Sequence, residues 1–229
     1  MAVARSCSSA SRRTGQVGWT RIPRLLGSIH PELWVFATAI LLLNLHVLPG
    51  LAALASEPRA FFPDRFAAGE WWLLLTHPLV HVSGYHLLLD AAAFFILHAS
   101  LETRSLATRL SVVAASAAGS LAAAWMLCPQ IESVGFCGLS GVDHGLMTFG
   151  ALELMRRGVG DRRTFAQGAI CLATVLVKSF LELVSGQCLF DFVHLGSVGM
   201  PLAPCHFGGA IGGAAAFAAM CRAKMCQKA

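Results

Sequence analysis

One serine and two histidines of this sequence border glycine-rich segments, at Ser140, His86 and His206. A serine hydroxyl is a poor nucleophile by itself, and a neighbouring imidazole that accepts its proton makes it competent. A helix that begins at Ser140 would also direct backbone N–H groups towards a developing oxyanion, to which the His86 ring could donate as well. These residue types favour nucleophilic acyl transfer, with Ser140 as the nucleophile and His206 as its base.

Glycines spaced by four residues indicate how the serine and its base could meet. Gly141 and Gly145 follow the serine, and Gly209 and Gly213 follow the second histidine. Small residues at this spacing let two helix backbones approach closely inside a membrane. We therefore expect the serine and the histidine to come within hydrogen-bond reach.

The composition is that of a membrane protein. The chain has 229 residues, of which 56% are hydrophobic and only 13% are charged, and its mean hydropathy is +0.65. A soluble domain carries about a quarter charged residues. The apolar runs are continuous and rich in Leu and Ala, which favours helices over the alternating strands of a membrane barrel. We predict an all-α membrane protein with one helical bundle.

Six apolar segments are candidates for spans, each of which needs about 20 residues. They cover 33–55, 86–101, 106–127, 139–155, 164–184 and 205–221. Arginines and lysines gather in the N-terminal tail, the 102–109 turn, the 156–163 turn and the C-terminal tail. Because positive residues mark the cytoplasmic side, six spans with both termini in the cytoplasm satisfy the pattern.

The same pattern divides the chain into three parts. Residues 1–30 hold five arginines and no acid, and lack the apolar stretch of a cleaved secretory signal. We expect a basic cytoplasmic tail over 1–30, a membrane domain over 31–222 and a second cytoplasmic tail over 223–229. The apolar run 71–75 is too short to span and is expected to be interfacial or re-entrant.

The net charge of +5 lies in these clusters rather than in a basic stripe with interleaved aromatics. We therefore expect the lipid bilayer, and no nucleic acid, as a partner. In this topology His86, Ser140 and His206 begin the second, fourth and sixth spans on the outer side. All three should lie at a similar depth near the outer face.

Three stretches, taken in order, resemble the rhomboid intramembrane proteases. The sequence GLSG at 138–141 resembles the GxSG motif of that family, and HFGGAIGG at 206–213 resembles its HxxGxxxG motif. The stretch THPLVHVSGYH at 76–86 is similar to the family's histidine-rich loop before the second span. The resemblance covers about residues 70–217 and implies a six-transmembrane-helix rhomboid-like bundle.

The resemblance also implies a mechanism. Ser140 and His206 would form a dyad without a third acid and hydrolyse a peptide bond in a transmembrane or tail-anchored substrate, through an acyl-enzyme and with no cofactor or metal. His86 would be the histidine on the oxyanion side, and Gly138 belongs to the serine motif. Both are expected to bind substrate or oxyanion.

Three positions depart from the family pattern. Asp90 stands where rhomboids commonly have Asn, and a carboxylate helps an oxyanion site only if it is protonated or turned to pair with His86. The usual Trp-Arg pair reads Trp71-Trp72. His144 stands where an aromatic residue often packs on the catalytic histidine, and its ring could pack similarly.

Some of these features are similar to the rhombosortase subgroup, namely Asp90, the compact layout, the string GLSGVDHGL and the pair Lys178 and Glu182. That resemblance implies a bacterial inner membrane, an active site towards the outer face, and substrates with a C-terminal Gly-Gly-type sorting tail. Lys178 and Glu182 are four residues apart, so they can form an ion pair on one helix face or contact the substrate tail.

Several alternatives stay open. The chain could be a catalytically silent rhomboid relative that binds transmembrane segments, a metal or haem protein that uses His77, His81 and His86, or a channel or transporter. His77 and His81 are otherwise expected to hydrogen-bond the first loop to itself. Four cysteines on the predicted outer side allow three disulfide pairings or none. They are Cys128, Cys137, Cys188 and Cys205.

Overall fold

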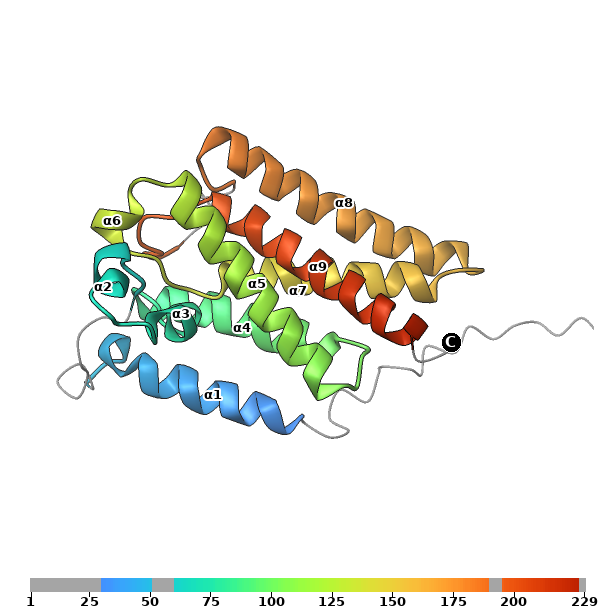
Figure 1. Ribbon diagram of the computed structural model, residues 1–229, viewed down its shortest axis with the longest axis horizontal. Helices are drawn as coiled ribbons and strands as arrows, with labels where there is room; N and C mark the ends of the chain where they lie inside the picture. Colours follow the sequence, from blue (N-terminus) through green and yellow to red (C-terminus); the bar gives the residue numbers. More distant parts are fainter. Residues whose placement is uncertain (1–29, 51–59, 190–194, 227–229) are drawn as a thin grey trace, which may run out of the picture.

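The computed structural model describes residues 30–50, 60–189 and 195–226, which form a helical bundle (Figure 1). The longer helices are α1 (Pro31–Leu43), α4 (Gly84–Ser100), α5 (Leu106–Leu127), α7 (Ser140–Arg157), α8 (Arg162–Ser185) and α9 (Pro204–Cys226). The shorter ones are α2 (Pro63–Ala67), α3 (Leu73–Thr76), α6 (Ile131–Val134) and two 3-10 turns, Leu45–Val47 and His77–Leu79.

The helices lie side by side, with α8 along one side of the bundle and α1 along the opposite side (Figure 1). The short helices α2, α3 and α6 gather at one end, whereas the α7–α8 turn and the end of α9 lie at the other. The predicted arginine-rich 156–163 turn and the C-terminal region are therefore on the same side of the molecule.

Glycines set the spacing at the centre of the bundle. A Cβ added to Gly209 would overlap the backbone of Gly141, and one added to Gly213 would overlap that of Gly145. On another face of α9, Gly208 meets the backbone of α5 in the same way. The prediction that two small-residue faces bring the backbones of α7 and α9 together is confirmed. Such close packing replaces the hydrophobic driving force that helices lack inside lipid.

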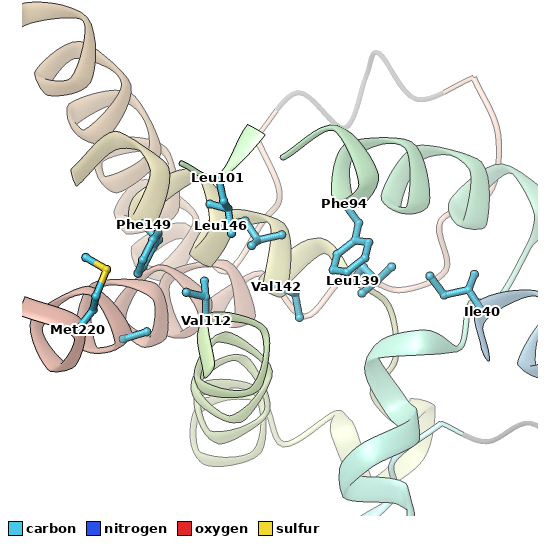
Figure 2. Close-up of a cluster of buried hydrophobic side chains, with 10 residues drawn as sticks. Ile40, Phe94, Leu101, Val112, Leu139, Val142, Leu146, Phe149 and Met220 are labelled. Carbon is cyan, nitrogen blue, oxygen red and sulfur yellow. The ribbon is translucent and has the colours of Figure 1, made fainter. Parts of the chain in front are cut away.

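Apolar side chains from five helices fill the rest of the interior (Figure 2). The cluster runs from Ile40 on α1 through Phe94 and Val142 to Met220 near the end of α9. Large apolar side chains also cover the outside, among them Ile96. An apolar exterior of this kind is what a lipid-facing surface requires.

Among the described residues, two helices, α5 and α8, are long and apolar enough to cross a membrane. The segments Leu73–Leu79 and Gly84–Ser100 would add a third span if they count as one, although they are bent by 94°. The chain is thus a multi-pass membrane protein, and the count of six spans stays a prediction. Residues 73–75 of the run 71–75 lie in α3, before this bend, and the interfacial or re-entrant placement of the run stays a prediction.

Two helix boundaries differ from the predicted segments by more than two residues. Helix α1 ends at Leu43 rather than continuing to 55, because the Asn44 amide donates to the carbonyls of Ile40 (2.7 Å) and Leu79 (2.6 Å) and turns the chain there. Helix α9 continues to Cys226, so residues 223–226 of the predicted tail are helical. The predicted tail over 1–30, apart from its last residue, and residues 227–229 lie outside the described residues.

Arg109 also differs from its predicted place in a turn. It lies in the first turn of α5 and is fully buried. Its guanidinium donates to Glu32 Oε1 (2.7 Å) and to the carbonyl and ring of His98 (3.0 and 2.9 Å). A buried charge needs such partners. Arg109 therefore ties α1, α4 and α5 together and is not a solvated topology signal.

Candidate active site

A cavity of about 330 Å³ lies among the ends of α4, α7, α8 and α9. Five of the six predicted site residues line it, together with both members of the predicted ion pair. These residues are His86, Asp90, Ser140, His144, His206, Lys178 and Glu182. The sixth, Gly138, lies directly behind the cavity wall. The structure thus brings the whole predicted set into one place.

The turn before Ser140 depends on Gly138. This residue has φ of 108°, which favours glycine, and its N–H donates to the carbonyl of His77 (3.1 Å). A Cβ at this position would lie 2.9 Å from His86 Cε1 and 3.0 Å from Asp90 Oδ2. The glycine therefore lets the chain press against both side chains and start α7 at Ser140, with the helix N-terminus at the cavity.

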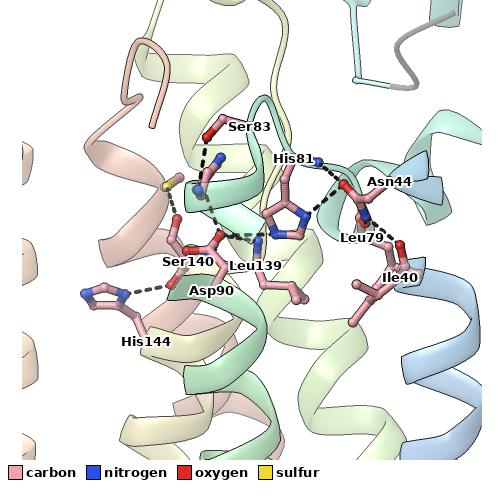
Figure 3. Close-up of polar contacts among 11 residues, drawn as sticks. Ile40, Asn44, Leu79, His81, Ser83, Asp90, Leu139, Ser140 and His144 are labelled. Carbon is pink, nitrogen blue, oxygen red and sulfur yellow. Dashed lines mark hydrogen bonds and ion pairs between the residues drawn. The ribbon is translucent and has the colours of Figure 1, made fainter. Parts of the chain in front are cut away.

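One oxygen of Asp90 organises this turn (Figure 3). Asp90 Oδ2 accepts hydrogen bonds from the backbone N–H of Leu139 (2.8 Å) and of Ser140 (3.1 Å). The same oxygen is 3.1 Å from His86 Nε2 and 3.5 Å from His81 Nε2. The carboxylate is turned to pair with His86, which is one of the two arrangements in which it can assist the site. It also engages the His86 ring, a predicted oxyanion donor, and one of the backbone N–H groups at the start of α7, that of Ser140.

His206 lies near the start of α9 and is held by a carboxylate from α8. Its Nδ1 is 2.8 Å from Glu182 Oε2, which leaves Nε2 as the nitrogen that can take a proton. The Ser140 hydroxyl lies 3.9 Å from the sulfur of Cys205, and within the described residues no hydrogen bond joins it to His206. Hydrogen bonds between catalytic groups are often long before substrate binds.

His144 connects the serine segment with the histidine. Its ring stacks on His206 with 4.1 Å between centroids and 12° between planes, which is the packing predicted for this position. Its Nδ1 donates to the carbonyl of Ser140 (2.7 Å), and its Nε2 accepts from Lys178 Nζ (3.2 Å). These partners assign the neutral tautomer to His144.

Glu182 is a residue of the candidate site whose contact with His206 the sequence did not reveal. The predicted ion pair with Lys178 is present, at 2.7 Å between Nζ and Oε1. The contact with His206 was missed because the two residues are 24 positions apart and lie on different helices. The only sequence signal for it was an acid inside an apolar segment, which is a functional candidate by default.

The site also contains a set of atoms that a metal could bridge. Ligand atoms of His144, Glu182 and His206 lie within 4.8 Å of one another. Lys178 already supplies the positive charge between the first two of them, so a cation would have to displace its ammonium group. The set proposed from the sequence, His77, His81 and His86, forms no such group within the described residues.

A family model settles the lineage. The Rhomboid domain model matches residues 68–223, well over half of the chain. The chain belongs to the rhomboid family. No curated protein matches it. Rhomboids are generally intramembrane serine proteases that act on membrane-embedded substrates, and some members are inactive. The rhombosortase subgroup stays a prediction.

Two features distinguish this rhomboid from the pattern that the resemblance implied. The resemblance implied no third acid, but the Glu182 carboxylate contacts His206. It also implied an Asn where Asp90 stands, and the carboxylate here holds the serine turn through two backbone N–H groups. The Asp90 side chain thus has a structural role in this turn.

The histidine-rich loop of this rhomboid is structural. The prediction that the loop is hydrogen-bonded to itself is confirmed for His77 and wrong for His81, whose partner lies outside the loop. His77 Nδ1 bonds to the carbonyl of Leu73 within the loop (3.0 Å). His81 bonds through its N–H and its ring to Asn44 Oδ1 (2.7 and 3.2 Å), so it ties the loop to the end of α1. The loop is fixed at both ends and presents His86 to the cavity.

The cysteines near the site are thiols in this structure. Cys128, Cys137 and Cys205 form no disulfide. Cys137, which lies in the turn before Ser140, is half-buried, and its desolvation there raises the pKa of its thiol to about 12. A thiol with so high a pKa is a poor nucleophile at neutral pH. Ser140 is therefore the better nucleophile candidate in this segment.

Proposed function

We propose that this rhomboid is an intramembrane serine endopeptidase in which Ser140 attacks the scissile carbonyl and His206 is the general base. The observation that carries the proposal is the contact of His206 Nδ1 with a buried carboxylate, at 2.8 Å, in the cavity that Ser140 lines. A base held in this way through Nδ1 has Nε2 available for the serine proton.

The proposed reaction has two steps. Ser140 Oγ bonds to the carbonyl carbon while its proton passes to His206 Nε2, and the carbonyl oxygen becomes an oxyanion. His206 then protonates the departing amine, which leaves an acyl-enzyme ester. Water attacks this ester with His206 again as base, and the new carboxylic acid and the serine hydroxyl are released.

The oxyanion would form beside the first turn of α7, where backbone N–H groups lack intrahelical partners. The Ser140 N–H and the His86 ring face Asp90 in this structure. The substrate oxygen must share these donors with the carboxylate or take them from it. Asp90 thereby becomes the residue that sets how strongly the oxyanion is held.

The substrate class follows from the surroundings. The cavity lies at the end of the bundle where α7 and α9 begin, opposite the arginine-rich α7–α8 turn (Figure 1). If that turn is cytoplasmic, the site opens near the outer boundary of a bacterial inner membrane. Apolar side chains such as Met200 and Leu202 complete the cavity wall. We propose membrane-anchored substrates, including proteins with a C-terminal Gly-Gly-type sorting tail.

Labelling with a fluorophosphonate serine probe tests the proposal without a known substrate. Detergent-purified wild type is compared with Ser140→Ala and His206→Ala, and the melting temperature of each protein is recorded. We expect labelling of the wild type alone. A folded wild type that does not label would contradict the protease assignment.

A catalytically silent rhomboid is the second candidate. The observation in its favour is that the Asp90 carboxylate engages the His86 ring and the Ser140 N–H. If the protein is silent, the wild type and Ser140→Ala should bind a transmembrane segment equally well, and neither should be labelled by the fluorophosphonate probe. Cleavage of a bound Gly-Gly-tailed substrate by the wild type alone would exclude this candidate.

A further inference from the structure

The strongest unassigned group in the molecule is the carboxylate of Glu182. It is fully buried, near the end of α8, and its two oxygens face different elements. Oε2 is 2.8 Å from His206 Nδ1, while Oε1 accepts from Lys178 Nζ (2.7 Å) and from the Leu189 N–H (2.9 Å). We infer that Glu182 is a positioning residue for His206, so that a Ser140–His206–Glu182 triad replaces the two-residue dyad. The inference rests on the proposed function.

The donors around Glu182 keep it charged. A carboxylate without partners is far too costly to bury, and breaking a buried pair exposes that cost. Here an ammonium group and a backbone N–H satisfy one oxygen, which frees the other for the imidazole. Lys178 therefore serves the base indirectly, by holding the carboxylate that holds the ring.

This contact decides which nitrogen of His206 is basic. An ionised carboxylate accepts only, so the proton of the neutral ring lies on Nδ1 and the lone pair on Nε2. When Nε2 takes the serine proton, the same carboxylate stabilises the imidazolium that forms. The stacked ring of His144, 4.1 Å away, prevents rotation out of this orientation. Lys178 also donates to His144, so one side chain fixes both rings.

The decisive variant is Glu182→Gln, which keeps the shape and removes the charge. A matched control is Glu153→Gln, because Glu153 is also a buried carboxylate that accepts two backbone N–H groups, those of Glu102 (2.9 Å) and Thr103 (3.1 Å), but lies in α7 away from the cavity. Fluorophosphonate labelling rates are measured from pH 5 to pH 10 for both variants and the wild type, beside their melting temperatures.

We expect Glu182→Gln to lower the labelling rate by about 10²- to 10⁴-fold, as the loss of the orienting acid does in serine hydrolases. The low-pH side of its labelling-rate profile should move to lower pH, because the His206 imidazolium has lost its anionic partner and gives up its proton more easily. Glu182→Asp should keep part of the rate, and added formate should raise the rate of Glu182→Ala. Glu153→Gln should label like the wild type.

Four results would overturn the inference. If a folded Glu182→Gln labels at the wild-type rate and loses labelling at the same low pH as the wild type, the carboxylate does not act on the base. The protease assignment would still stand. Equal losses in both Gln variants, in step with their melting temperatures, would show a structural effect only. A folded wild type that does not label would remove the proposed function together with the triad. If Glu182→Gln does not fold, the formate arm decides: no gain in Glu182→Ala refutes the inference.

Discussion

The α7–α9 contact allows a quantitative test of what holds Ser140, the proposed nucleophile, close to His206, its proposed base. In Gly209→Ala, the new Cβ would lie 2.6 Å from the carbonyl carbon and 3.1 Å from the Cα of Gly141, and still closer to its oxygen. Ordinary contacts need 3.4 to 4 Å, so the two backbones must separate by about 1 Å. Overpacking of this kind costs about 1–3 kcal/mol.

The same shift should reach the chemistry. Gly209 follows His206 by three residues, and Gly141 is adjacent to Ser140. A separation of the two backbones at this contact would therefore move the Ser140 and His206 side chains apart. A displacement of about 1 Å at a catalytic group can cost about 100-fold in rate. We therefore expect Gly209→Ala to melt at a lower temperature and to label with the fluorophosphonate probe about 100-fold more slowly.

Gly150→Ala is the matched control. Gly150 also lies inside α7, but a Cβ at this position meets nothing within 4 Å. The change should stabilise the helix by about 0.5–1 kcal/mol, because alanine is the better helix former, and should leave labelling unchanged. If Gly209→Ala melts and labels like the wild type, the glycine contact does not set the spacing of Ser140 and His206, and this reasoning is wrong.

Further predictions concern other parts of the molecule. Asp90→Asn keeps an acceptor for the Leu139 and Ser140 N–H groups and removes the competing anion, so its labelling rate should equal or exceed that of the wild type. Asp90→Ala leaves both N–H groups without an acceptor and should lower the free energy of unfolding by about 2–4 kcal/mol; equal stability of the two variants in chemical unfolding would contradict this. Arg109→Gln breaks the buried pair with Glu32 and should cost about 3–5 kcal/mol, whereas Arg157→Gln, which removes an exposed pair with Glu102, should cost less than about 1 kcal/mol. Because the pKa of the Cys137 thiol is about 12, iodoacetamide should alkylate it slowly at pH 8, whereas the exposed Cys226 should react faster. Mass spectrometry of the alkylated peptides measures both rates, and faster alkylation of Cys137 would contradict this prediction. Dialysis against EDTA should leave labelling by the serine probe unchanged, and a loss that zinc restores would favour a metal between His144, Glu182 and His206.

The sequence was sufficient to predict features that depend on residue spacing within one helix. The spacing of four between Gly141 and Gly145, and between Lys178 and Glu182, places each pair on one helix face, and both predictions are confirmed. The helices themselves follow from apolar runs bounded by charged or glycine-containing turns. These are local properties, and a helix repeats every 3.6 residues whatever it packs against.

Contacts between distant elements could not be obtained in this way. The contact of Glu182 with His206 depends on how the ends of α8 and α9 pack, and the 185–204 connection gives no signal for it. The end of α1 was misplaced because its stop is an asparagine that bonds to a loop 35 residues later. Arg109 looked like a topology charge because its partners Glu32 and His98 come from other helices.

The close backbone contact between α7 and α9, at Gly141–Gly209 and Gly145–Gly213, affects how the surrounding bilayer acts on this protein. Main-chain atoms form this contact, and because they have no side-chain rotamers, the contact cannot adjust by rotamer changes. Helix α8 lies along one side of the bundle (Figure 1), meets the main chain of α7 through Gly168 near its start, and carries Glu182 near its end. Membrane helices respond to hydrocarbon thickness by changing their tilt. A thinner or thicker membrane that tilts α8 would therefore change the distance from the Glu182 carboxylate to the His206 imidazole while Ser140 and His206 keep their spacing. If these residues act as proposed, lipid chain length would then change the reaction rate without changing how α7 and α9 pack.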